Sequence, residues 1–432
     1  MINFSFLSVI RSIILLTILL PITACDRYLP TQNIPTISIT AIPTSTLSPS
    51  PDLTQTSTGP LTLRIWLPPQ FHPSADIRAG KLLQARLDEF TQRRPGVRLE
   101  LRIKAVNEPG GLLESLTTTS AAAPQILPDL VALPRPILET AAAKGVLHPL
   151  DGLTNLLDDE DWFEYSRNLA SVQNNNFGFP FAGDALIMVY REEIVKQVPL
   201  DFASALTSTY TLAFPASDPQ ALFPLALYLS AGGEIQNAQG QPSLNAEILK
   251  DVLAFLHEAQ YSGFTPYWLT QYKSDQEVWQ ALLEKRCELI ITWVSRYLNK
   301  SPTNAVATII PTPRGSAFTL ANGWIWASAS HHPENLALSI ELAEYLSDSD
   351  FLAKWIEALG YLPTRPSALG AWQDASVQML LNQVASSAYL FPSSEILAII
   401  TPPISQATIQ VLKEQKDPYS AAQEAVEALA KP

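Results

Sequence analysis

Apolar and polar residues begin to alternate near residue 61. Every second residue of LTLRIWL (61–67) is aliphatic, and this period of two predicts a strand. Apolar residues then recur every three or four positions over 79–90, which predicts a helix that a Pro-Gly pair ends. Alternation returns in VRLELRIK (97–104), and PDLVAL (128–133) is a continuous apolar run typical of a buried parallel strand.

A further helix, predicted to open at Pro136 and to close at Gly145, continues this succession of strands and helices. Strict succession of this kind predicts an open α/β sheet. Ligands of such sheets bind beyond the carboxyl ends of the strands. The predicted strand ends at 66–71 and 133–135 are therefore the first places where we expect a binding site.

The second half of the chain is richer in predicted helices. A helical stripe covers 246–259, and Ser274 with Glu277 has the spacing of a capping box. No internal repeat of solenoid length is visible. The remaining predicted elements are three strand-like runs and then three helices: 288–293, 305–310, 323–330, 333–346, 350–359 and the residues after 418.

The first 24 residues have the layout of an export signal. Arg11 precedes the apolar run SIILLTILLPI (12–22), which is too short for a confident membrane span. The following Thr23-Ala24-Cys25 resembles a bacterial lipobox, in which a cysteine thiolate accepts a lipid. The sequence thus predicts a signal peptide over 1–24 and lipidation at Cys25; the alternative is an ordinary signal peptide with an incidental cysteine.

Residues 25–59 are predicted to form one segment, because from Leu29 to Pro60 the chain is rich in proline, threonine and serine and has almost no charge. This composition predicts an unstructured, partly polyproline tether with an extended reach of roughly 90 Å. We therefore expect a folded domain held on the extracytoplasmic face of the bacterial cell membrane through Cys25.

Composition narrows the possible partners. The formal net charge of −13 argues against nucleic acid or an anionic membrane surface as a partner. Of the two cysteines, Cys287 is interpreted as a small core residue, so no disulfide is expected. The five histidines form no HExxH pattern, and the chain has no P-loop and no G-x-S-x-G. We expect neither a cofactor nor a metal, although carboxylate pairs for glycoside hydrolysis could still meet in space.

Four segments occur in an order that resembles one family. They are PDLVALPRPILETAAAKGVLHPLDGL, FGFPFAGDALIMVYREEI, LEKRCELIITWVSRYL and HHPENLALSIELAEYLSDSDFLAKWIEALGYLPTRPSAL. Together they resemble the bacterial extracellular solute-binding proteins of ABC transporters, and are most similar to the maltose-type family. The chain departs from the usual pattern at Tyr190-Arg191, where Tyr-Asn is common, and at Arg286-Cys287, where a glycine is common.

The resemblance implies an α/β fold of the periplasmic-binding-protein type (type II), with two lobes joined by crossing strands. Lobe 1 would take 60–183 with a return segment near 288–330, and lobe 2 would take 184–287 and 331–432. The first crossing would fall at Gly183-Asp184-Ala185, and closure would be a hinge motion.

The resemblance also implies a monomeric binding protein that is not an enzyme. It would capture a small solute, with a carbohydrate favoured, and deliver it to the membrane permease subunits of an ABC importer. Two alternatives stay open. One is a surface carbohydrate-active enzyme or adhesion lipoprotein, and the other is a receptor of the same fold that presents its ligand to a sensor.

Candidate ligand residues follow from strand ends and from the resemblance. Aromatic platforms and polar groups suit the faces and hydroxyls of a sugar. Core packing is the alternative for the aromatic residues, a solvated turn for Asp184, and a structural role for the other polar residues. The predicted ligand-binding residues are Trp66, Gln70, Phe71, Arg135, Asp184, Phe223, Trp293 and Trp324.

Overall fold

The computed structural model of this 432-residue chain describes residues 60–75, 77–300 and 304–429. These residues belong to one compact unit, Thr58–Pro432. The predicted signal peptide (1–24), the predicted lipidation site Cys25 and the predicted tether (25–59) lie outside the described residues.

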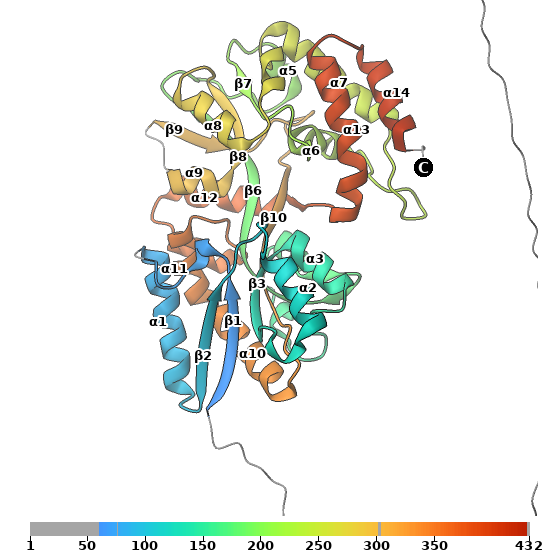
Figure 1. Cartoon of the computed structure of the whole chain (residues 1–432). Coiled ribbons are helices and arrows are strands. Elements are labelled where there is room, and N and C mark those ends of the chain that lie inside the picture. The colour runs from blue at the N-terminus through green and yellow to red at the C-terminus, as the bar shows by residue number, and fades with distance from the viewer. Residues whose placement is uncertain (1–59, 76, 301–303, 430–432) are drawn as a thin grey trace, which may run out of the picture. The chain divides into compact units, whose positions relative to one another are not determined.

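A nine-stranded mixed sheet runs through this unit (Figure 1). Strands β1 to β3 are parallel to one another, whereas β10 is antiparallel to its neighbours β3 and β6. A two-stranded sheet, β4 (Ser171–Val172) and β5 (Asn175–Asn176), lies apart. The order of the main sheet is β2 (Val97–Ile103), β1 (Leu61–Leu67), β3 (Leu130–Pro134), β10 (Thr319–Ala327), β6 (Gly178–Arg191), β8 (Leu289–Trp293) and β7 (Leu212–Ala213), with β11 (Ala388–Leu390) beside β10 and β9 (Ala305–Thr308) beside β6.

Strand β6 changes partners along its length. Its first half, 178–185, pairs with β10, and its second half, 186–191, pairs with β8 and β9. Because each half belongs to a different group of strands, β6 joins two lobes. A third segment passes the same point, since Leu362 forms an isolated bridge with Gly183.

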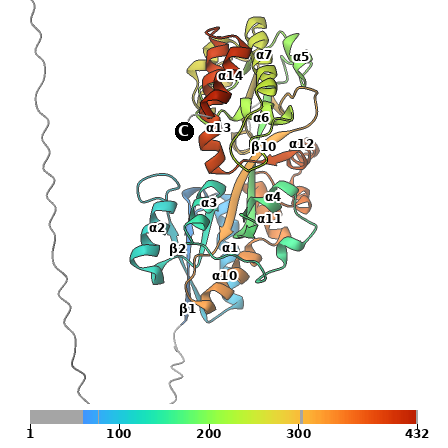
Figure 2. The same ribbon diagram turned by 90° about the vertical axis from the view of Figure 1, so that its right-hand side faces the viewer.

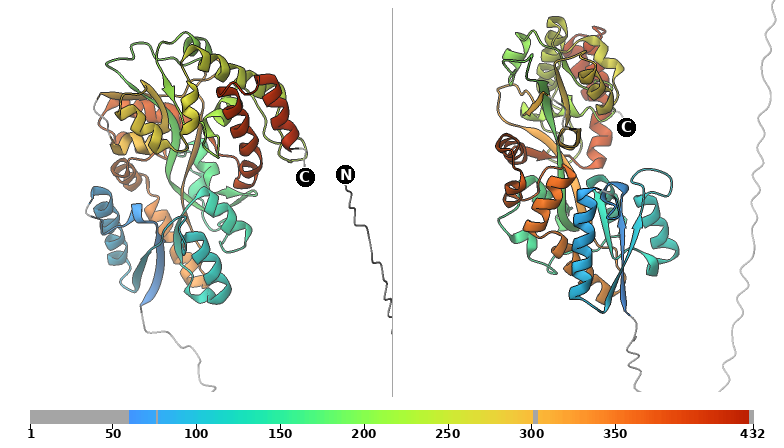
Figure 3. Two further views of the ribbon diagram at one scale, coloured as in Figure 1. Left: turned by 45° about the horizontal axis from the view of Figure 1, so that its top comes forward. Right: turned by 90° about the vertical axis from the view of Figure 1, so that its left-hand side faces the viewer.

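Lobe 1 is built from β1, β2 and β3, together with the lower parts of β6 and β10. The alternation in β1 sends Leu63 and Ile65 to one face and Trp66 to the other, and a layer of helices covers each face. Figures 2 and 3 show the two layers on opposite sides of the strands. The first layer is α1 (Arg78–Arg93), α10 (Pro333–Leu346) and α11 (Ser349–Leu359), and the second is α2 (Leu112–Ala122) and α3 (Arg135–Ala143).

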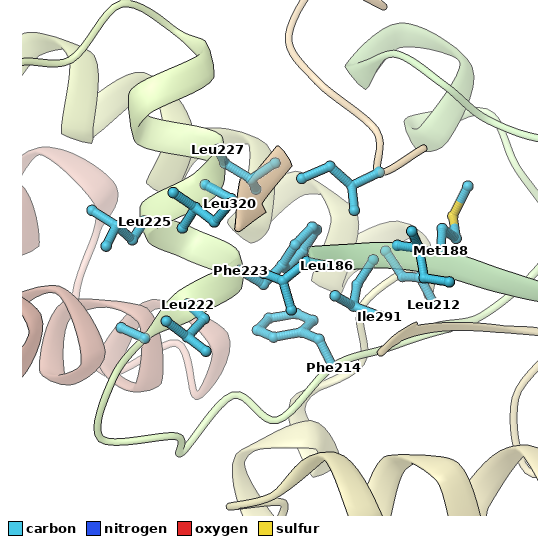
Figure 4. Packing of buried hydrophobic residues seen from close by; sticks show 14 of the residues in the cluster. Leu186, Met188, Leu212, Phe214, Leu222, Phe223, Leu225, Leu227, Ile291 and Leu320 are labelled. Atoms are coloured by element: carbon cyan, nitrogen blue, oxygen red, sulfur yellow. The ribbon is translucent and has the colours of Figure 1, made fainter. Parts of the chain in front are cut away.

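Lobe 2 surrounds β7, β8 and the upper part of β6 with one large core. Figure 4 shows part of this core, in which Phe214 and Phe223 pack with Leu186 and Ile291. Helix α4 (Glu164–Leu169) lies beside β10 and β11 at the crossing. The helices of lobe 2 are α5 (Phe202–Leu206), α6 (Leu222–Ser230), α7 (Ala246–Ser262), α8 (Asp275–Leu283), α9 (Val294–Lys300), α12 (Ala375–Ser386), α13 (Ser394–Leu412) and α14 (Pro418–Leu429).

By length and composition alone, α13 is apolar enough to cross a membrane. Its residues Ile400, Ile404 and Val411 are instead buried in the lobe-2 core. We therefore interpret α13 as a core helix. The remaining short elements are 3-10 helices at Pro69–Phe71, Pro124–Ile126, Leu156–Asp158, Tyr267–Gln271 and Pro366–Ala371.

Several local predictions are confirmed. Gly263 ends α7 with a φ of 85°, a left-handed conformation that glycine adopts without a steric cost. Ser274 and Glu277 form the predicted capping box at the start of α8. Cys287 is a buried free cysteine just before β8, as predicted.

The predicted lobe boundaries need correction. The segment 289–308 was expected in lobe 1, but β8 and β9 pair with the upper half of β6 and so belong to lobe 2. Conversely, α10 and α11 (333–359) were expected in lobe 2, yet they pack against α1 and the lobe-1 sheet. The chain returns to lobe 1 through β10 and crosses back near Leu362.

Candidate functional site

A pocket of about 170 Å³ lies in lobe 2 at the carboxyl end of β8. Its walls come from the segment between β7 and α6, from the start of α8 and from β8; we call it the lobe-2 pocket. Two predicted site residues, Phe223 and Trp293, line it. The polar residues on its walls are Asp218, Gln220, Lys273, Ser274, Asp275 and Thr292.

Asp275 is the most constrained polar group of the lobe-2 pocket. It follows the N-cap Ser274, so its carboxylate stands in the first turn of α8, where the helix dipole favours a negative charge. Thr292 donates a hydrogen bond to this carboxylate at 2.5 Å, and the Arg296 guanidinium forms an ion pair with it. Burial raises the pKa of Asp275, while these two partners act in the opposite direction.

Asp218 is the second carboxyl group of the lobe-2 pocket. Its Oδ1 accepts a hydrogen bond from the backbone N–H of Gln220 at 2.9 Å, and burial raises its pKa. Carboxyl groups, an amide and an ammonium thus stand beside the rings of Phe223 and Trp293. Such a wall can stack on an apolar face and exchange hydrogen bonds with hydroxyl groups of one ligand.

Asp184 stands at the crossing, as predicted, on the strand β6 that joins the lobes. Its carboxylate accepts hydrogen bonds from the backbone N–H of Ser295 at 3.0 Å and from the Ser295 hydroxyl. Burial raises the pKa of Asp184 to about 7, and the charge of Asp275 acts in the same direction. Asp184 is therefore a carboxyl group of the crossing strand bonded to α9 rather than a solvated turn residue, and it lines neither the lobe-2 pocket nor the pocket described next.

A second pocket, of about 390 Å³, lies between α4 and lobe-2 segments. The end of α4 belongs to lobe 1, because Leu169 packs in the lobe-1 core with Val131; we therefore call this cavity the interlobe pocket. The ring of Phe391, on its wall, lies 5.9 Å from the ring of Trp293, on the wall of the lobe-2 pocket. This aromatic pair places the two pockets next to each other along the lobe boundary. The interlobe pocket is lined by Tyr165, Asn168, Gln236, Tyr389, Phe391 and Ser393, among others.

Trp66 does not line either pocket. It is 2% exposed and packs in the lobe-1 core with Leu116 and Val131, while the Lys104 ammonium lies 5.0 Å from its ring. The prediction treated the alternating polar face of β1 as accessible. Helices α2 and α3 cover that face, so Trp66 has the core role that was its alternative.

Phe71 and Trp324 lie together, but in an aromatic cluster of lobe 1. Their ring centroids are 5.0 Å apart at a right angle, and Phe71 also contacts Phe181 and Tyr361. Phe71 is buried, whereas Trp324 is half-buried. Neither residue lines the lobe-2 pocket or the interlobe pocket.

The two polar candidates of lobe 1 have different environments. Gln70 is exposed and lines neither pocket. Arg135 donates to Glu139 at 2.7 Å and to the carbonyl oxygens of Asn168 and Leu169 at 2.8 and 2.6 Å. Because its guanidinium is engaged by these protein groups, Arg135 has a structural role in the lobe-1 wall.

The polar residues of the lobe-2 pocket were not predicted from the sequence. Asp275 directly follows the capping residue Ser274, so the capping box was a usable signal for a carboxylate at a helix start. Asp218 and Gln220 belong to the DPQALFP segment in which only Phe223 was selected. Among the described residues, no group of three or more His, Cys, Asp or Glu side chains could hold a metal ion.

The family model described as "Bacterial extracellular solute-binding protein" matches residues 85–380 of the chain. A search of curated proteins finds no match. Many solved structures have a similar fold. One is the GacH receptor of Streptomyces glaucescens GLA.O, determined unliganded and in complex with acarbose. Its sequence is 18% identical and its TM-score is 0.64, and the match covers 86% of this chain and 98% of that chain.

Two further structures extend this similarity. The cyclic alpha-maltosyl-1,6-maltose binding protein from Arthrobacter globiformis is 14% identical, with a TM-score of 0.71, over 86% of this chain and 98% of that one. A solute-binding protein from Thermotoga lettingae bound with alpha-D-tagatose is 18% identical, with a TM-score of 0.62 and the same coverage of this chain, and 99% of its own. At these identities the similarity establishes the two-lobed fold.

Proposed function

Because the chain belongs to the bacterial extracellular solute-binding proteins, we propose that it captures a carbohydrate along its lobe boundary and delivers it to an ABC importer. Members of this family are solute-binding proteins and not enzymes, which confirms the prediction that the chain has no catalytic activity. The family also places the protein outside the cytoplasm.

The make-up of the lobe-2 pocket carries the proposal of a carbohydrate. The half-buried Trp293 offers an apolar face and the buried Phe223 backs the apolar wall, while Asp218, Gln220 and Asp275 offer acceptors and donors within the same cavity. A pyranose or furanose ring has an apolar face and a rim of hydroxyl groups. The apolar face can stack on the aromatic wall of the pocket, and the hydroxyls can form hydrogen bonds with its polar wall. The sugars named for the similar structures support the same class of ligand.

Membrane attachment is the second part of the proposal. The lipobox-like residues before Cys25 and the Pro/Thr/Ser-rich composition of 25–59 support a lipid-anchored protein with a tether. An anchored binding protein stays near the membrane subunits to which it would deliver its solute. Labelling with a radioactive fatty acid that appears in the natural chain and is absent from Cys25→Ser would test this anchor.

A thermal-shift screen tests the ligand class. The purified protein is mixed with maltose, acarbose, tagatose, spermidine or amino acids. A solute present at a hundred times its Kd should stabilise the folded protein by about 2.7 kcal/mol, which raises the Tm by a few degrees. We expect a sugar to give this shift, and Trp293→Ala to lose it.

Trp268→Ala is the matched control, because Trp268 is also half-buried in lobe 2, against Tyr272, but lies outside the lobe-2 pocket. This variant should keep the shift. A shift with spermidine alone would contradict the carbohydrate assignment. Loss of the sugar shift in Trp268→Ala with retention in Trp293→Ala would contradict the assignment of the site.

A further inference from the structure

Glu139 connects the two lobes. It lies on α3 of lobe 1, and its carboxylate accepts hydrogen bonds from the backbone N–H and the hydroxyl of Ser394, at 2.9 and 2.8 Å. Ser394 is the first residue of α13, which packs in the lobe-2 core. Figure 2 shows α13 reaching from lobe 2 toward α3. The bond therefore crosses the lobe boundary.

The other side of the Glu139 carboxylate is held by lobe 1. Arg135 Nε donates to it at 2.7 Å, and both side chains are 11% exposed. Arg135 also donates to the carbonyl oxygens of Asn168 and Leu169 at the end of α4. A charge-assisted pair shielded from water, facing the positive end of a 19-residue helix, is a strong and directional contact.

This connection borders the interlobe pocket. Asn168, whose carbonyl oxygen accepts from Arg135, lines that pocket on the α4 side. Ser393 and Ile396, on either side of Ser394 in the sequence, line it on the α13 side. Separation of the lobes would move these two walls apart and would break the bonds of Glu139 to Ser394 in the same motion.

We propose that Arg135, Glu139 and Ser394 form an interlobe clasp in which Glu139 is a positioning residue. The clasp holds α13 against lobe 1, so that both walls of the interlobe pocket are in place before a solute enters. It thereby raises the affinity for the solute without touching it, because less of the binding free energy is spent on bringing the lobes together. The effect on affinity rests on the proposed function, whereas the effect on the lobes does not.

A distance measurement tests the clasp without any ligand. Spin labels are attached at Gln92→Cys on α1 and at Tyr261→Cys on α7, two exposed positions in different lobes. Cys25→Ser is added so that Cys287, which is buried, is the one natural cysteine left in the sequence. Glu139→Ala should broaden the distance distribution between the labels and shift it by several ångströms.

Two variants serve as comparisons. Glu139→Gln keeps an acceptor for Ser394 without the charge, and should restore part of the original distribution. Glu114→Gln is the matched control, because Glu114 accepts a backbone N–H bond from Gly110 within lobe 1 only. It should leave the distribution unchanged. If the Glu139→Ala distribution overlays that of the parent, the clasp does not hold the lobes and the proposal is wrong.

Calorimetric titration with maltose tests whether the clasp raises the affinity for a solute. We expect Glu139→Ala to bind maltose about tenfold more weakly than the parent, within the usual range of coupling between sites, and Glu114→Gln to bind it equally well. Unchanged maltose affinity in a variant whose lobes have moved apart would refute the link to binding. If the parent binds no sugar, the proposed function fails, while the distance comparison still decides whether the clasp exists.

Discussion

Replacing Asp184 by asparagine should change how the stability of the protein depends on pH. Asp184 lies on the crossing strand β6, bonded to Ser295, and burial raises the pKa of its carboxyl group to about 7 from an ordinary value of 3.8. Asparagine has the same shape and can still accept from the Ser295 N–H. The substitution therefore removes the ionisation with little change in the packing.

The direction of the pH dependence of stability follows from the number of protons that the folded and unfolded states bind. Between pH 3.8 and about 7 the folded protein retains a proton on Asp184 that the unfolded chain has lost. The free energy of unfolding must then fall as the pH rises through this window, by a little over 1 kcal/mol per pH unit. Over the full window the free energy of unfolding would fall by about 4 kcal/mol, an upper limit because Asp184 as a residue is only half-buried.

Urea unfolding at pH 5, 6, 7 and 8 and constant ionic strength measures this dependence. The parent protein should lose stability relative to Asp184→Asn as the pH rises, by up to about 3 kcal/mol between pH 5 and 7. Asp158→Asn, at an exposed position, is the control, and its free energy of unfolding should change with pH in the same way as that of the parent. If Asp184→Asn also runs parallel to the parent across the range, the carboxyl group is ionised throughout and the reasoning fails.

Three further substitutions or reactions probe the crossing and the core. Arg365 is 3% exposed and pairs with two aspartates, so Arg365→Met should lower the free energy of unfolding by about 2 kcal/mol in urea; no change would show the pairs to be energetically neutral. Burial raises the pKa of Cys287 to about 12. In a Cys25→Ser protein, a thiol reagent should therefore modify Cys287 only as fast as the protein unfolds, and faster modification would contradict this prediction. A Cβ at Gly183 would lie 2.1 Å from the Tyr165 hydroxyl oxygen and 2.8 Å from the ring carbon that bears it, so Gly183→Ala should lower the free energy of unfolding by about 2 kcal/mol. A smaller loss when Tyr165→Phe is added would assign part of the clash to the hydroxyl, and an unchanged free energy of unfolding in Gly183→Ala itself would contradict the clash.

The elements of the fold could be predicted because local patterns determine them. The period of two in 61–67 and the glycine at 263 correspond to a strand and to a helix end in the structure. The division into lobes could not be predicted in the same way. The apolar run of β8 would suit either lobe, and its place is decided by pairing with the second half of β6, about a hundred residues earlier in the chain.

The candidate tryptophans show that the binding site, too, depends on contacts between distant segments of the chain. Trp66 and Trp293 both stand at or near the carboxyl end of a strand, where the rule for α/β sheets predicts a ligand. Around Trp66, α2 and α3 come from later segments of the chain and bury the ring in the lobe-1 core. Trp293, in contrast, stays half-buried at the end of β8, where it lines the lobe-2 pocket and lies 5.9 Å from the ring of Phe391. The rule thus selects strand ends, but the helices that later segments of the chain place over a strand end decide which of its side chains remain accessible to a solute.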